Sequence, residues 1–152
     1  VPDQLVKMVD DWHQSHLHIL VDYKLKKLEG MWAKIDPFLL IIVVHNILDN
    51  AVKYNQSAEP EISISDIIQG DQYIFKIKDN GIGIPAGELK VIFKKFHRGS
   101  SVNSVKAKGL GLGLYLVRLI IELHDGKVSI VSEIGHGTEI SISIPIKHER
   151  AI

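Results

Sequence analysis

The chain has 152 residues, and its 18 Lys and Arg residues balance its 18 Asp and Glu residues, so the formal net charge is zero. A neutral chain has no general attraction for nucleic acid or anionic membranes, so we expect neither as a partner. The absence of cysteine excludes disulfides and thiolate metal sites. Apolar residues make up 45% of the chain, enough for one globular domain over residues 1–152. The longest apolar run, residues 37–44, is too short to span a bilayer.

The N-terminal third predicts an amphipathic helix over residues 3–14, with Asp3 as its N-cap, and then strands over residues 18–25 and 31–35. Its first residues read as the continuation of an upstream segment, so we expect an excised domain. The same stretch holds three histidines, His13, His16 and His18. Because they straddle a helix end and a strand, we interpret them as solvated surface residues rather than a metal cluster.

Residues 36–55 predict a long helix that is buried on most of its circumference, because Asp36 and Pro37 form a start signal and the residues that follow are almost all apolar. Asn46, Asn50 and Lys53 share one stripe of this helix. Two carboxamide oxygens and one ammonium suit a hydrated Mg²⁺ and a phosphate, since Mg²⁺ takes oxygen ligands and keeps several waters. The alternative is two buried asparagines that bond to nearby backbone.

Residues 62–67 and 73–77 predict a β-hairpin, and its second strand ends at Asp79, with Gly81 and Gly83 just beyond. In an apolar pocket a carboxylate there can accept a hydrogen bond from an exocyclic amine, and the glycines permit close approach of the backbone. The alternative is an ordinary turn, since Asp-Asn-Gly is also a turn signal.

Residues 86–108 predict a positively charged lid. The stretch is polar, and a short helix is expected around residues 88–96. It contains several basic side chains but a single carboxylate, Glu88. A positive segment between two glycine motifs suits a lid that closes on phosphates, and the alternative is a solvated surface loop.

Glycines and leucines then alternate in the run Gly109, Leu110, Gly111, Leu112 and Gly113. An apolar helix follows, and we expect it to end with Gly126 as its C-cap. Uncovered N–H groups at the start of this helix would attract anions such as phosphate; the alternative is a flexible loop before a core helix. Residues 127–133 and 138–145 alternate apolar and polar side chains and predict a half-buried antiparallel hairpin.

Five stretches of the chain, in this order, resemble the sequence boxes of the catalytic ATP-binding domain of sensor histidine kinases. Residues 45–54 look like the N box, 79–83 like the G1 box, 93–98 like the F box, 109–113 like the G2 box and 135–138 like the later Gly-x-Gly-Thr element. The resemblance covers residues 5–145. It implies an α+β fold of the Bergerat type, a two-layer α/β sandwich with a mixed, largely antiparallel sheet, helices on one face and an ATP lid.

The resemblance also implies roles for individual residues. Asn50 would be the Mg²⁺ ligand, Asn46 would stand in the same polar stripe and Lys53 would reach a phosphate, so these three form the catalytic set. Asp79 would bond the adenine amino group, directly and through water with help from Thr138. Gly81 and Gly83 would make room for the nucleotide, and Phe93 and Phe96 would anchor the lid. The implied nucleotide-binding residues are Asn50, Lys53, Tyr54, Asp79, Gly81, Gly83, Ile84, Gly109, Leu110, Gly111, Leu112, Gly113 and Thr138.

The implied reaction is transfer of the ATP γ-phosphoryl, with Mg²⁺, to a histidine on a separate upstream dimerisation domain, followed by signalling to a response regulator. No stretch of this chain resembles that domain, so we expect a monomer with little or no activity by itself. We expect the domain to be cytoplasmic, whether or not the parent protein is anchored in the inner membrane.

Three other functions remain as alternatives. ATPases of the same fold family place a glutamate base where this chain has Asn46, and an amide cannot accept a proton as a carboxylate does. His45 is a second candidate for the base, but it lies one residue from that position, and a packing or surface role is the alternative. A serine kinase of the anti-sigma-factor type would share the boxes, and a degenerate nucleotide-binding docking module would keep the fold without the reaction.

Overall fold

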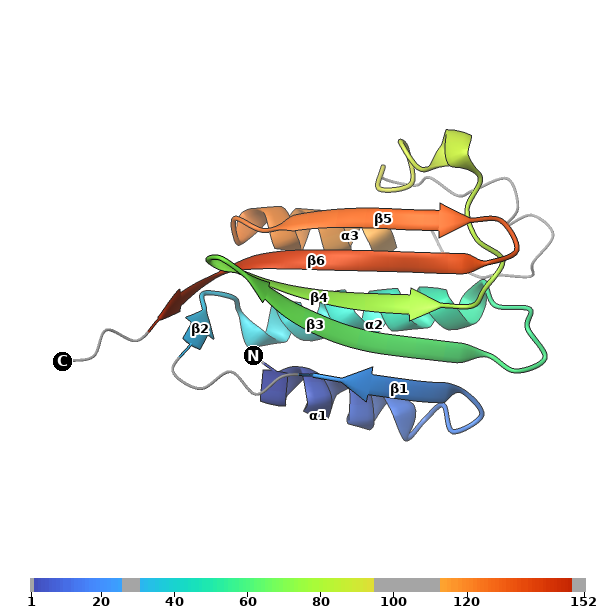
Figure 1. Cartoon of the computed structure of the whole chain (residues 1–152), viewed down its shortest axis with the longest axis horizontal. Helices are drawn as coiled ribbons and strands as arrows, with labels where there is room; N and C mark the ends of the chain where they lie inside the picture. The colour runs from blue at the N-terminus through green and yellow to red at the C-terminus, as the bar shows by residue number, and fades with distance from the viewer. Residues whose placement is uncertain (1, 26–30, 95–112, 149–152) are drawn as a thin grey trace.

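The computed structural model describes residues 2–25, 31–94 and 113–148 (Figure 1). Its α-helices are α1 (Pro2–His13), α2 (Pro37–Lys53) and α3 (Gly113–Leu123), and a 3₁₀ helix spans Ala86–Glu88. Its strands are β1 (Leu20–Lys24), β2 (Met31–Ala33), β3 (Glu61–Gln69), β4 (Gln72–Asp79), β5 (Lys127–Glu133) and β6 (Gly137–His148).

The strands form one mixed sheet with β6 at its centre. The order β1-β3-β4-β6 continues to β5 along the first part of β6 and to β2 along its last residues. Only the β1–β3 pair is parallel among these described pairs, and the others are antiparallel. This confirms the prediction of a mixed, largely antiparallel sheet.

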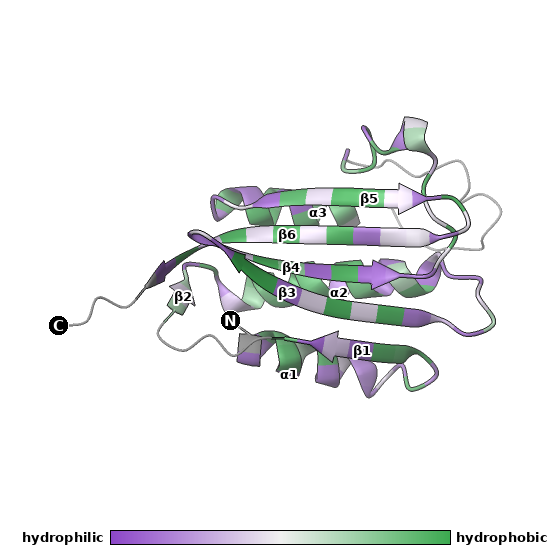
Figure 2. Cartoon of the chain, in the orientation of Figure 1, coloured by the Kyte–Doolittle hydropathy of each residue, from purple (hydrophilic) through white to green (hydrophobic). Residues whose placement is uncertain are grey.

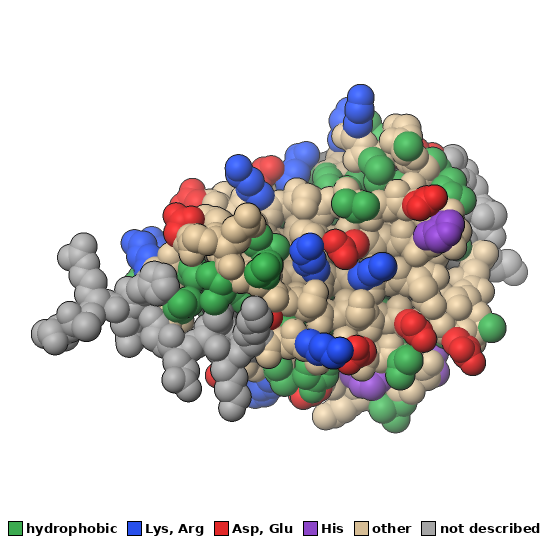
Figure 3. Space-filling view, viewed as in Figure 1, with side chains coloured by type: hydrophobic (Ala, Val, Ile, Leu, Met, Phe, Trp, Pro, Cys, Tyr) green, Lys and Arg blue, Asp and Glu red, His purple; other side chains and the backbone are tan. Residues whose placement is uncertain are grey.

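The three α-helices lie behind one face of the sheet, and the core fills the space between the two layers (Figure 1). Alternate residues of the central strands point into this core, including Tyr73, Phe75, Ile140 and Ile142, which are buried. The alternation of apolar and polar residues along β3, β4 and β6 is visible in Figure 2. The opposite face carries lysine and acidic side chains (Figure 3). By strand alternation Lys76 and Glu139 belong to this face, and Lys76 Nζ lies 3.7 Å from Glu139 Oε1.

Helix α2 begins where the sequence predicts. Asp36 Oδ1 accepts hydrogen bonds from the backbone N–H groups of Phe38 (2.8 Å) and Leu39 (3.4 Å), which satisfies two donors of the first turn. The helix then buries one side against the sheet through Leu40, Val43, Val44, Ile47, Leu48 and Ala51. No helix in the described part of the chain is long and apolar enough to cross a membrane.

Two local predictions are wrong. Residues 89–93 form successive turns after the 3₁₀ helix instead of an α-helix, because the hydrogen bonds from Val91 and Lys94 each reach only three residues back. The rest of the expected helix lies outside the described residues. The left-handed residue after α3 is Asp125 (φ 58°), not Gly126, whose missing side chain instead makes room for the carbonyl of Ser143.

The interpretation of the three histidines as solvated is wrong for two of them. His13 is half buried and its Nε2 lies 2.9 Å from the Ile19 carbonyl oxygen. His16 is half buried too, and its ring stacks on Trp12 at a centroid distance of 4.0 Å. His18 is exposed, as expected. Tertiary packing of the helix end against the following loop decides this difference.

Candidate functional site

Three polar side chains stand side by side where β4 and β5 end and β6 begins. Asp79 shares its face of β4 with the buried Phe75 and Ile77, so it points to the side of the sheet that the helices cover. By the same alternation, Thr138 lies on the apolar face of β6 and Ser132 on the apolar face of β5. These two residues are directly paired in register. Each apolar row thus ends in a hydrogen-bonding group at the same end of the sheet.

Asp79 is held through one of its two carboxylate oxygens. Oδ1 accepts hydrogen bonds from the N–H groups of Gly81 (2.8 Å) and Thr138 (3.3 Å), while Oδ2 accepts none within the described part of the chain. Burial raises the pKa of Asp79 to about 6, although the two N–H groups oppose the rise. The carboxylate is therefore poorly solvated and retains one oxygen for a further donor.

Glycines allow the segment after β4 to pack closely. A Cβ on Gly81 would stand 2.7 Å from the carbonyl oxygen of Tyr54, and the N–H of Ile82 donates to that same oxygen (3.0 Å). Gly83 has a φ of +76°, and its Cβ would collide with the carbonyl of Glu133. The space that the sequence analysis assigned to a nucleotide is thus filled by protein backbone at both positions, and their contact with a nucleotide stays a prediction.

Ser132 belongs to this corner although the sequence analysis gave it no role. Its Oγ accepts from the N–H of Ile84 (2.8 Å), donates to the carbonyl of Gly137 (3.0 Å) and lies 2.7 Å from Thr138 Oγ1. It therefore joins the segment after β4 to the β5–β6 turn. A signal was present in the sequence, because Ser132 interrupts the apolar alternation of its strand one step after Ile130.

Asn80 is a second residue that the sequence analysis left without a role. Its Oδ1 accepts from Asn55 Nδ2 (2.8 Å) and from the N–H of Glu61 (2.9 Å), and its Nδ2 donates to the carbonyl of Glu59 (3.0 Å). These bonds tie the end of β4 to the loop between α2 and β3. They hold Asp79 next to the last turn of α2.

The polar stripe of α2 meets the first residue of α3. Asn46 Nδ2 donates to the carbonyl of Ile42 (2.8 Å), and a Cβ on Gly113 would stand 2.9 Å from Asn46 Oδ1 and 3.8 Å from Asn50 Nδ2. Both asparagines are half buried. Lys53, the last residue of α2, is exposed, and the half-buried Tyr54 follows it. The structure thus brings Gly113 next to Asn46 and Asn50, and their role in binding phosphate stays a prediction.

Several predicted site residues cannot be placed. Gly109, Leu110, Gly111 and Leu112, the lid beyond residue 94 and Phe96 lie outside the described residues. Phe93 is described and half buried. Their roles stay predictions.

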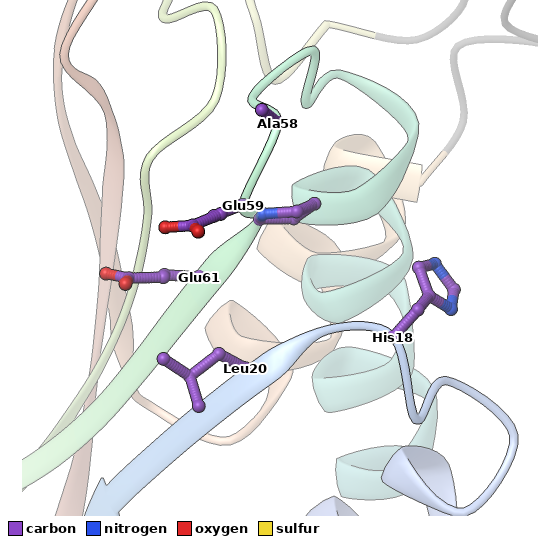
Figure 4. A pocket seen from close by; sticks show the side chains of 6 residues that line it. His18, Leu20, Ala58, Glu59 and Glu61 are labelled. Carbon is purple, nitrogen blue, oxygen red and sulfur yellow. The ribbon is translucent and has the colours of Figure 1, made fainter.

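A hollow lies beside the start of β1, next to the backbone of Glu59 and Glu61 that Asn80 binds. It is lined by His18, Leu20, Ala58, Glu59, Pro60 and Glu61 (Figure 4). The two glutamates point away from His18 in Figure 4. Among the residues that the structure describes, no three His, Asp or Glu side chains are placed to hold a metal ion.

Comparison with known proteins identifies the family. The model of histidine kinase-, DNA gyrase B- and HSP90-like ATPases matches residues 35–148, which include α2, β4, α3 and the β5–β6 hairpin. The chain belongs to this ATPase family. The match contains the whole of the corner described above.

Several sensor kinases resemble this ATPase-family domain in sequence. It is 35% identical over 118 residues to sensor protein kinase WalK of Staphylococcus epidermidis, a match that covers 77% of the chain and 19% of WalK. It is 33% identical over 133 residues to the circadian input-output histidine kinase CikA of Synechococcus elongatus, covering 86% of the chain and 17% of CikA. The chain thus spans about a fifth of the length of the curated relatives it matches.

Solved structures confirm the Bergerat-type fold. The mycobacterial sensor histidine kinase MprB superposes with a TM-score of 0.82 at 23% identity, covering 96% of this chain and 95% of that one. The catalytic domain of histidine kinase ThkA superposes with a TM-score of 0.76 at 20% identity, covering 94% and 90%. The ATPase-family domain therefore has the fold of histidine kinase catalytic domains.

Proposed function

We propose that this domain binds ATP with Mg²⁺ and donates the γ-phosphoryl group to a histidine on a separate dimerisation domain of a sensor histidine kinase. The observation that carries the proposal is the Asp79 carboxylate, which is largely buried, held by two backbone N–H groups and left with one free oxygen. It stands next to the stripe of α2, so a base site and a phosphate site are neighbours.

The chemistry of the free Asp79 oxygen suits adenine. A buried carboxylate gains most from a donor that replaces lost water, and the adenine amino group is such a donor. The half-buried Tyr54 follows α2 and its backbone carbonyl lies against Gly81, so we expect its ring to offer apolar surface to the base. Thr138 adds a hydroxyl next to the carboxylate.

The polar stripe suits a magnesium–phosphate unit. Asn46 Nδ2 is already bonded to Ile42, which leaves its Oδ1 toward the start of α3. Asn50 would hold Mg²⁺, with Asn46 beside it and Lys53 at a phosphate, and the N–H groups around Gly109, Gly111 and Gly113 would bind phosphate oxygens. The cation, when bound, offsets the negative charge of the phosphates.

The same stripe argues against efficient ATP hydrolysis. A base for water would have to stand near the phosphates, but Asn46 is a neutral amide whose nitrogen is committed to the helix backbone. We therefore expect binding of ATP with slow turnover, and transfer only when an acceptor histidine is supplied. The acceptor domain, the response regulator and a cytoplasmic location, with the parent protein free or anchored in the inner membrane, are part of this proposal.

Calorimetric titration of the 152-residue chain with ATP, ADP and GTP, with and without Mg²⁺, tests the binding step. We expect adenine-selective binding, strengthened by Mg²⁺ for ATP. A helical domain that carries the acceptor histidine is then added with labelled ATP, and label on histidine is the expected result.

Two results would contradict the proposal in different ways. Absence of nucleotide binding would favour a degenerate docking module. Binding with rapid hydrolysis and no label on histidine would favour an ATPase.

A further inference from the structure

Ser132 bears on how the base site selects its purine, a question that rests on the proposed function. Ser132 and Thr138 form a direct hydroxyl pair across β5 and β6, with 2.7 Å between their oxygens. A contact this short requires a hydrogen between the two oxygens. Which residue donates it decides what Thr138 offers to a ligand.

The partners of Ser132 settle the direction. A serine hydroxyl has one hydrogen and two lone pairs. The N–H of Ile84 occupies one lone pair (2.8 Å), and the carbonyl of Gly137 can only accept, so it takes the hydrogen of Ser132 (3.0 Å). One lone pair remains, and Thr138 must donate to it for all three contacts to be hydrogen bonds.

Thr138 then faces the site with lone pairs alone. Its hydrogen is used toward Ser132, and the neighbouring ionised Asp79 is also an acceptor, with Oδ2 free. The two groups belong to adjacent strands, and the N–H of Thr138 binds Asp79 Oδ1 (3.3 Å), so they present one surface that contains acceptors only. Such a surface accepts an amino group and repels a carbonyl oxygen.

We propose that Ser132 is a positioning residue for purine selection: it holds the Thr138 hydroxyl as an acceptor, so that the site prefers a 6-amino purine to a 6-oxo purine. Ser132 does not touch the base in this account. It acts through Thr138, and its loss frees the Thr138 hydrogen to turn toward the ligand.

The test compares binding of ATP and ITP, which carry a 6-amino and a 6-oxo purine on the same ribose and triphosphate. For Ser132→Ala, we expect the ratio of the ITP Kd to the ATP Kd to fall about three- to tenfold, the effect of redirecting one hydrogen bond. A purely structural role of Ser132 would weaken both nucleotides equally and leave the ratio unchanged. Ser132→Thr keeps the hydroxyl and should retain the ratio. Ser129→Ala, on the opposite face of the same strand, is the matched control.

A double-mutant cycle isolates the pathway through Thr138. Thr138→Val removes the hydroxyl that Ser132 orients, so adding Ser132→Ala to it should not change the ratio further. If Ser132→Ala does not fold, Ser132→Cys, with its weak donor and acceptor, should lower the ratio in the same direction.

The outcomes separate this inference from the proposed function. An unchanged ratio in Ser132→Ala or Ser132→Cys overturns the role of Ser132 while ATP binding stands. Wild-type protein that binds neither ATP nor ITP overturns the proposed function, and the inference with it. If Ser132→Ala lowers the ratio of the ITP Kd to the ATP Kd by the same factor in wild type and in Thr138→Val, Ser132 does not act through Thr138.

Discussion

The end of β4 and the polar stripe of α2 meet at one corner of the molecule, but they are fixed by different means. Asp79 on β4 and Ser132 on β5 are held by hydrogen bonds with the segment after β4, at Gly81 and Ile84, and with the start of β6, at Gly137 and Thr138. Asn46 is held by its own helix, through the carbonyl four residues earlier, and Asn50 follows on the same face. The first region is fixed by tertiary contacts and the second by helical geometry.

This difference indicates how the two halves of the site would work. In the proposed function the base side would be preorganised around the buried Asp79 carboxylate, so its selectivity would depend on a few exact bonds. On the proposed phosphate side the Asn46 amide oxygen lies beside Gly113, where a cation and its waters would complete the shell. We therefore expect substitutions at the base side to change specificity, and those on α2 to change the dependence on Mg²⁺.

The largest expected effect is that of Asp79→Asn on adenine binding. The substitution replaces the free acceptor with an amide whose nitrogen faces the adenine amino group, so ATP affinity should fall about a hundredfold, the value of a hydrogen bond to a charged group. Calorimetric titration of wild type and the variant with ATP, ADP and adenosine measures the change in affinity. Comparable loss for ATP, ADP and adenosine is expected, and a loss confined to ATP would assign Asp79 to the phosphate side.

The same variant should be more stable than wild type without ligand. Because the pKa of Asp79 is raised from 3.8 to about 6, the folded protein binds the proton more tightly than the unfolded chain, and this group lowers the free energy of unfolding as pH rises between those values. At pH 7.5 a neutral Asn removes that cost and keeps an oxygen for Gly81 and Thr138. Thermal melting should show a higher Tm, and a lower one would contradict the pKa shift.

Gly83→Ala should be the next largest effect, on stability. A Cβ would be added at a φ of +76° and against the Glu133 carbonyl, so the free energy of unfolding should fall by about 2–4 kcal/mol. Gly135→Ala is the matched control, since its φ is +81° but nothing lies within 4 Å of its Cβ position, and about 1 kcal/mol is expected. Chemical denaturation compares them. Equal losses would mean that the contact with Glu133 adds nothing.

Asn50→Ala tests the phosphate side. ATP affinity in the presence of Mg²⁺ should fall about tenfold, as for the loss of one ligand or its hydrogen bond, while adenosine affinity stays within twofold. Titrations with and without Mg²⁺ separate the loss of Mg²⁺-dependent phosphate binding from any loss of base binding. A loss of equal size for adenosine would place Asn50 in the base site or in the packing of α2.

The smallest effect is the pH dependence of adenine binding. If the ionised form of Asp79 binds, a pKa of about 6 leaves roughly a quarter of the protein competent at pH 5.5, so ATP affinity should be about fourfold weaker than at pH 7.5. Asp79→Asn should lose this dependence. A wild-type profile that is flat over this range would show that the charge of Asp79 does not contribute to binding.

The sequence by itself determined most of the helices and strands and the residues that make up the α2 stripe. The alternation of apolar residues placed β3 to β6, the Asp36 cap placed the start of α2, and a helical repeat put Asn46, Asn50 and Lys53 on one face. These are local properties, set by residues within a few positions of one another. Asp79 could also be selected as a candidate binding residue, because a single carboxylate at the end of an apolar strand is costly to bury unless it binds a donor.

Only the tertiary structure decided what surrounds Asp79. Its partners come from residues 81 and 138, Ser132 reaches Ile84 across 48 residues, and Asn80 connects to the loop after α2. The tertiary structure also explains Gly81 and Gly83. The absence of a side chain lets them pack against the backbone of Tyr54 and Glu133, contacts that no local sequence pattern shows. Sheet register, a long-range property, determines that the Ser132 and Thr138 hydroxyls stand opposite each other beside the Asp79 carboxylate.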